Sequence, residues 1–138
     1  MKYLIDTHVL LWLVDENPAA AIPGPILDAL AQQRHDILVS AVTPWEISLK
    51  HWMGKLPKAA PVLAQWDSIM ARLSATGLTI SDRHAILAGR LDWTHKDPFD
   101  RMLAAQAMLE DATLVSKDPV FCGVPGLRTA WDFGGDSV

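Results

Sequence analysis

Four acidic side chains stand next to predicted strands and helices, at positions where a ligand site would form. Asp6 ends a short apolar run, and Asp118 closely follows another. Glu46 and Asp100 each stand in the first turn of a predicted helix. Because an open parallel sheet binds its ligands at the carboxyl ends of the strands, we expect these four carboxylates to converge at one edge of the sheet.

Such a cluster of carboxylates is costly without a cation. At a separation of about 5 Å and an effective dielectric constant of about 20, each pair repels by roughly 3 kcal/mol. Oxygen ligands favour a hard divalent ion, Mg²⁺ or alternatively Mn²⁺, and the lack of a Cys or His cluster argues against zinc. Magnesium held by carboxylates keeps several waters and recruits phosphate oxygens. The predicted chemistry is therefore phosphodiester hydrolysis by an activated water.

Each of these acids also has a purely structural interpretation. Thr43 and Glu46 have the spacing of a capping box, in which Glu46 only satisfies a backbone donor. Asp100 could complement a helix dipole, Asp118 could cap a short turn, and Asp6 could cap the helix that follows it. The functional interpretation rests on all four falling at one predicted sheet edge.

The elements that must position these acids alternate between strand and helix. The predicted strands are Tyr3–Ile5, Ile37–Val39, Leu78–Ile80 and Leu114–Val115, with an edge strand within Leu127–Trp131. Two predicted helices have both ends marked, at Thr7–Val14 and Pro61–Leu73. A further helix begins at Pro23, one runs from Thr43 to a stop at Gly54, one runs from Ser81-Asp82 through Leu91, and the last begins at Asp97-Pro98. Right-handed crossovers then give an α/β sandwich, a mostly parallel sheet with helices on both faces.

Length and composition limit the remaining possibilities. A chain of 138 residues with 50% hydrophobic content predicts one domain, residues 1–131, followed by a flexible tail at 132–138. The single cysteine, Cys122, forbids an internal disulfide and fits a reducing compartment, so we expect the cytoplasm. The longest apolar run, Val9–Val14, is far shorter than the roughly 20 residues of a membrane span, and we expect no signal peptide.

The net charge of −4 disfavours long-range attraction to nucleic acid, so a local basic patch or a bound cation would have to supply it. The basic candidates are Lys50, His51, Lys55, Lys58, Lys96, Arg101 and Lys117. The tryptophans Trp12, Trp45, Trp52 and Trp66 are candidate anchors for a partner, with core packing as the alternative.

Four segments together resemble a known family. They are Tyr3–Trp12 (YLIDTHVLLW), Trp45–Ile47 (WEI), Asp97–Ala107 (DPFDRMLAAQA) and Leu114–Asp118 (LVSKD). In this order, over about residues 2–131, the chain resembles PIN-domain (PilT N-terminus) proteins of the VapC toxin type.

The resemblance implies a PIN-like three-layer sandwich and a magnesium-dependent endoribonuclease toxin of a toxin–antitoxin system. It also implies a VapB-type antitoxin as inhibitor and a homodimer. By position, Asp6 and Asp100 would be the principal metal ligands, Glu46 the third catalytic acid, and Asp118 the fourth, acting through water. Loops of tRNA or rRNA are plausible substrates, because sequence-specific RNA recognition normally targets unstacked bases.

Other interpretations of the same residues remain. A phosphatase with Asp6 as covalent nucleophile would usually carry a second Asp two residues later, where this chain has His8. A phosphoaspartyl signalling domain would need an acceptor Asp after the third strand, where Ser81-Asp82 reads as a helix cap. A PIN-like module that binds RNA or protein without activity is a third alternative.

Overall fold

The computed structural model describes residues 1–131, in which five parallel strands form one sheet. The strands are β1 (Lys2–Ile5), β2 (Asp36–Ser40), β3 (Ala75–Leu78), β4 (Thr113–Val115) and β5 (Thr129–Ala130). Their order is β3-β2-β1-β4-β5, so β1 lies at the centre, between β2 and β4. The predicted tail, residues 132–138, lies outside the described residues.

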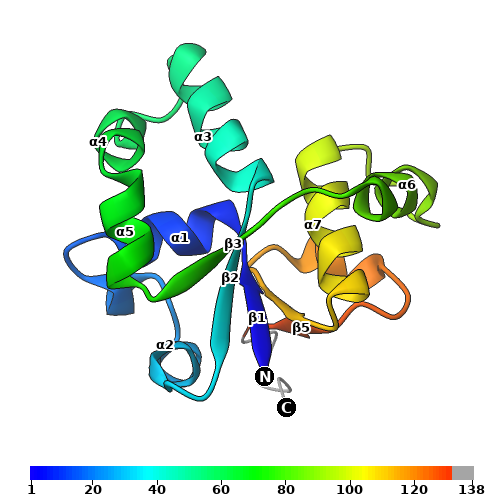
Figure 1. Cartoon of the computed structure of the whole chain (residues 1–138), viewed down its shortest axis with the longest axis horizontal. Helices are drawn as coiled ribbons and strands as arrows, with labels where there is room; N and C mark the ends of the chain where they lie inside the picture. Colours follow the sequence, from blue (N-terminus) through cyan, green and yellow to red (C-terminus); the bar gives the residue numbers. More distant parts are fainter. Residues whose placement is uncertain (132–138) are drawn as a thin grey trace.

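Helices cover both faces of this sheet. They are α1 (Thr7–Leu13), α2 (Gly24–Ala31), α3 (Val42–Trp52), α4 (Ala59–Ala64), α5 (Trp66–Arg72), α6 (Asp82–Arg90) and α7 (Pro98–Leu109), with 3₁₀ turns η1 (Pro18–Ala20) and η2 (Pro119–Gly123). Figure 1 shows α1, α2, α4 and α5 gathered on one side of the sheet and α6 and α7 on the other. The predicted α/β three-layer sandwich is confirmed.

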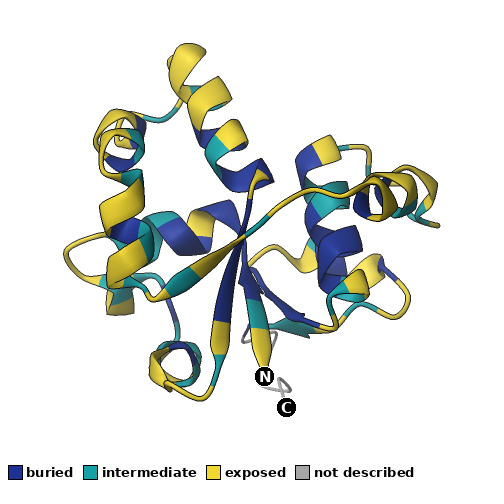
Figure 2. Cartoon of the chain, in the orientation of Figure 1, coloured by how far each residue is buried: buried dark blue, intermediate teal, exposed yellow. Residues whose placement is uncertain are grey.

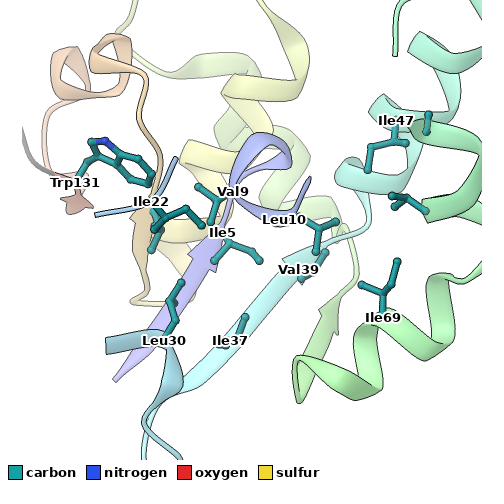
Figure 3. Close-up of a cluster of buried hydrophobic side chains, with 13 residues drawn as sticks. Ile5, Val9, Leu10, Ile22, Leu30, Ile37, Val39, Ile47, Ile69 and Trp131 are labelled. Carbon is teal, nitrogen blue, oxygen red and sulfur yellow. The ribbon is translucent and has the colours of Figure 1, made fainter. Parts of the chain in front are cut away.

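The core divides at the sheet because successive strand residues point to opposite faces. Ile5 belongs to a cluster with Val9, Leu10 and residues of α2, α4 and α5. Its neighbour Leu4 packs on the opposite face with Leu103 and other residues of α7. The central strands are correspondingly buried in Figure 2, and Figure 3 shows the side chains of the first cluster. Burial on both faces explains why these short strands appear in the sequence as continuous apolar runs.

Two predicted caps begin helices where expected. The Ser81 hydroxyl accepts a hydrogen bond from the amide of His84 at the start of α6, and an Asp97 carboxylate oxygen accepts one from the amide of Asp100 at the start of α7. Pro98 follows at the first helical position, where its missing amide hydrogen costs nothing. The start of α7, and with it the position of Asp100, is therefore set by local sequence.

Two local predictions were wrong, and one structural alternative is not found. The single helix predicted at 61–73 is two helices, α4 and α5, separated at Gln65, whose backbone leaves the helical region. The third strand is Ala75–Leu78 instead of 78–80, because its parallel register with β2 ends at the pair Ser40 and Leu78. The alternative capping box at Thr43 is absent: the N-cap of α3 is Ala41, two residues before Thr43, and it makes no side-chain cap bond.

None of the helices in the part of the chain that the structure describes is long and apolar enough to cross a lipid bilayer.

Candidate active site

Asp6 lies at the carboxyl end of the central strand β1 and caps α1. One of its carboxylate oxygens accepts a hydrogen bond from the amide of Val9 at 2.9 Å. The residue is only 8% exposed. The capping role expected as an alternative is therefore real, and it holds the carboxylate at the sheet edge.

Glu46 comes from the first half of α3 and is buried. The Thr7 hydroxyl donates to its Oε1 at 2.6 Å, and the Lys50 ammonium donates to its Oε2 at 2.6 Å. Both carboxylate oxygens thus bind side chains, and neither serves the helix N-terminus. The contact with Thr7 ties the start of α1 to α3, next to Asp6.

Asp100 stands in the first turn of α7, where the Asp97 cap positions its backbone. Its Oδ2 lies 2.7 Å from Nε2 of His95, in the segment that precedes the helix. The carboxyl is about one quarter exposed, so it faces the solvent side of the site.

Asp118 follows β4 and is exposed. Its Oδ1 accepts a hydrogen bond from the amide of Val120 at 3.0 Å, so it caps η2 as the structural interpretation expected. Its own amide donates to the Ser116 hydroxyl at 3.1 Å, which fixes the turn after the strand.

All four acids line one cavity of about 130 Å³, which we call the acidic cavity. It lies where the carboxyl ends of β1 and β4 meet the first turns of α1 and α7. Its other lining residues are Thr7, His8, Lys50, Asp97, Leu103 and Phe121. Residues far apart in the sequence are therefore brought to one place by the parallel topology.

Two carboxyls of the acidic cavity, those of Asp6 and Asp100, have raised pKa values. Burial raises the pKa of the Asp6 carboxyl; the Ser116 hydroxyl and the Val9 amide oppose this shift, and the charge on Glu46 adds to it. Burial likewise raises the pKa of Asp100; His95 opposes this shift, and the charges on Asp97 and Glu46 add to it. Both carboxylates are thus more costly to ionise than in water, chiefly because burial removes their hydration.

The donor set fits a hard divalent cation in its chemistry. The converging groups are carboxylate oxygens, and a cation would offset the cost of ionising Asp6 and Asp100. Within residues 1–131, however, no three His, Cys, Asp or Glu side chains are arranged closely enough to hold an ion. Carboxylate ligands are present, but one oxygen of Glu46 contacts Lys50 and one oxygen of Asp100 contacts His95.

Two partners of the acids were not foreseen from the sequence. Lys50, predicted only as a possible RNA contact, binds Glu46; the spacing of four residues along a helix is a signal that could have found this ion pair. His95 contacts Asp100 from an irregular segment, and no periodic pattern marks it. The Ser116 hydroxyl also contacts Asp6 and opposes the rise in the pKa of that carboxyl.

Arg101 was a candidate RNA contact but has a structural role. Its guanidinium donates to the main-chain carbonyls of Ala88, Gly89, Leu91, Trp93 and His95. These groups belong to the end of α6 and the segment leading to α7. Arg101 thus holds the backbone that presents His95 to Asp100.

Comparison with known proteins agrees with this architecture. The model of the PIN domain family matches residues 3–127, and the chain belongs to that family. None of the curated protein sequences compared with the chain matches it.

Several solved structures share the fold. VapBC2 from Rickettsia felis bound to a promoter DNA fragment has a TM-score of 0.70 at 21% identity, over 94% of this chain and 97% of that one. DNA-bound VapBC from Salmonella typhimurium has a TM-score of 0.68 at 20% identity, over 94% and 96%. A toxin–antitoxin complex from Klebsiella pneumoniae has a TM-score of 0.62 at 22% identity, over 92% and 96%.

Proposed function

We propose that this protein is a magnesium-dependent endoribonuclease, the toxin of a toxin–antitoxin pair. The observation that carries the proposal is that Asp6, Glu46, Asp100 and Asp118 line one small cavity in a PIN-domain chain. Burial and neighbouring negative charge oppose the ionisation of Asp6 and Asp100, so placing these two carboxyls beside two further acids does not by itself stabilise the fold. A divalent cation resolves that conflict, and Mn²⁺ could replace Mg²⁺.

In this proposal Asp6 and Asp100 are the principal ligands, Glu46 the third acid, and Asp118 contributes through water from the exposed rim. Bound Mg²⁺ would supply Lewis-acid polarisation of a phosphate and make water a stronger nucleophile. The chain's own groups do the positioning. The Val9 amide orients the Asp6 carboxylate, the Thr7 hydroxyl orients Glu46, and the Asp97 cap orients the backbone of Asp100.

The proposed substrate is RNA cut at a phosphodiester bond, with loops of tRNA or rRNA as plausible targets. Since the net charge is −4, a bound divalent cation would also be part of the attraction for phosphate. Several other basic side chains are already engaged: Lys58 pairs with Asp15 and Lys117 lies over the Trp12 ring. The proposed place of action is the cytoplasm.

The proposed partners are a VapB-type antitoxin and a second copy of this chain. The antitoxin is supported by the solved structures that share the fold, which include VapBC assemblies and a toxin–antitoxin complex. The homodimer is supported by the exposed apolar face of α3. On that face Trp45 is 57% and Trp52 84% exposed, with Leu49 and Met53 beside them.

The decisive experiment is cleavage of total RNA by the full chain with Mg²⁺ and with EDTA, with the new ends mapped. We expect discrete cuts with Mg²⁺ and none with EDTA, and a loss of at least about a hundredfold in rate for Asp6→Asn, since removal of one principal group usually costs this much or more. Metal-independent cutting, or full activity of Asp6→Asn, would refute the proposal. No cleavage across many RNAs, with RNA binding retained, would favour the binding module without activity.

A further inference from the structure

Lys50 occupies a distinctive position in the acidic cavity. Among the described residues that line this cavity, it is the only lysine or arginine. Its Nζ lies 2.6 Å from Oε2 of Glu46, whose other oxygen accepts a hydrogen bond from Thr7. The Glu46 side chain is 9% exposed and the Lys50 side chain 34%, so the pair is only partly screened by solvent.

We propose that Lys50 is the internal counterion of Glu46 and that a divalent cation binding in the acidic cavity competes with its ammonium for this carboxylate. This inference rests on the proposed function, because it concerns the same carboxylates. It accounts for the position of one of the four acids, Glu46, in a cavity where no three candidate ligands of residues 1–131 are close enough to hold an ion. With its two oxygens bound to Thr7 and Lys50, Glu46 has fewer lone pairs free for a cation.

The direction of the effect follows from charge. One carboxylate cannot hold an ammonium and a divalent cation equally well, and two cations in so small a cavity repel each other. The ion pair therefore weakens the apparent affinity for metal, because only the fraction of molecules in which Lys50 has left Glu46 binds the cation with full affinity. The i, i+4 spacing on α3 lets the ammonium swing away without moving the backbone.

Mn²⁺ binding tests the inference directly, because the free ion can be counted by electron paramagnetic resonance without any substrate. We expect Lys50→Met to bind Mn²⁺ roughly three- to tenfold more tightly than the wild type at low ionic strength, and Lys50→Arg to stay close to the wild type. Lys58→Met is the matched control, since it removes the same charge and breaks an exposed ion pair, with Asp15, outside the acidic cavity. It should leave Mn²⁺ affinity unchanged.

A double variant separates displacement from a general charge effect. In the Glu46→Gln background the ion pair is gone, so adding Lys50→Met should change the affinity much less than it does in the wild type. An equal effect in both backgrounds, or unchanged or weaker binding by Lys50→Met alone, overturns the inference while leaving the metal site intact. If neither the wild type nor Lys50→Met binds Mn²⁺, the proposed metal-dependent function fails as well.

Discussion

Single side chains in this protein serve the fold and the candidate site together. Asp6 is the clearest case: its oxygen caps α1, yet its buried carboxyl is costly to ionise. Asn is an equally good cap without the charge. The substitution Asp6→Asn therefore separates the two roles.

The raised pKa of Asp6 predicts a pH-dependent gain in stability for metal-free Asp6→Asn. Below about pH 3 the carboxyl is protonated in both folded and unfolded wild type, so the stability difference between variant and wild type should not depend on pH there. As the pH rises, the unfolded chain ionises first, and the folded wild type becomes less stable relative to it. We expect the advantage of Asp6→Asn to grow from pH 4 to pH 7, as measured by urea unfolding in EDTA.

The exposed carboxyl of Asp92 provides the control for this series, since Asp92→Asn alters the net charge equally. A stability difference for Asp6→Asn that stays constant with pH would contradict a raised pKa. Added Mg²⁺ should stabilise the wild type and not Asp6→Asn, because only the wild type would bind it.

Helix starts and ends decide where the acids lie. The N-cap of α3 is Ala41, so Glu46 does not have the position that a capping box with Thr43 would give it, and it lines the acidic cavity instead. The hydroxyl of Thr43 is fully buried and makes no hydrogen bond with the described residues. A polar group in that state contributes a desolvation cost instead of a cap.

We therefore expect Thr43→Val to leave the free energy of unfolding unchanged or to raise it. A capping box would predict the opposite, a loss of about 1 kcal/mol. Denaturant unfolding at constant pH distinguishes the two. Ser81→Ala, which removes a cap seen in the structure, is the comparison variant and should lose about 1 kcal/mol.

The end of α6 depends on Arg101, whose guanidinium binds five carbonyl oxygens there. Arg101→Met leaves several of these groups without a partner, and we expect a loss of about 2 to 4 kcal/mol in the free energy of unfolding. Arg83→Met, on the exposed side of the same helix, should cost little. If both variants unfold alike, Arg101 is not the cap of this segment.

The whole molecule combines an acidic cavity at one end of its sheet with an exposed apolar face on α3. Large exposed aromatic side chains grouped on one helix are unusual for a monomer. The proposed homodimer would cover them, and a stable dimer needs roughly 800 Å² from each subunit. The same helix carries Glu46 and Lys50, so such an interface would lie next to the acidic cavity.

Light scattering on the full chain tests this surface. We expect a dimer for the wild type and a monomer for Trp52→Glu, because a charge at the centre of an apolar contact is costly. Ile86→Glu, at an apolar position of α6 that is 63% exposed, should remain a dimer. A dimeric Trp52→Glu would show that the copies associate through another surface.

Local patterns were enough to predict the α/β class, the buried central strands, the caps at Ser81 and Asp97, and the placing of the acids near strand ends. These features depend on neighbours within a few residues, or on the rule that parallel strands share an edge. The edge strand β3 and the break at Gln65 were mispredicted because half-exposed segments carry weak apolar signals.

The partners of the acids could not be predicted in the same way. Thr7 reaches Glu46 across 39 positions of sequence, and His95 meets Asp100 from an irregular segment held by Arg101. Such contacts depend on how the helices pack in the folded chain, and the short-range periodicity of the sequence does not predict that packing. Folding therefore decided which partner each carboxylate contacts, whereas the acids themselves could be recognised from the sequence.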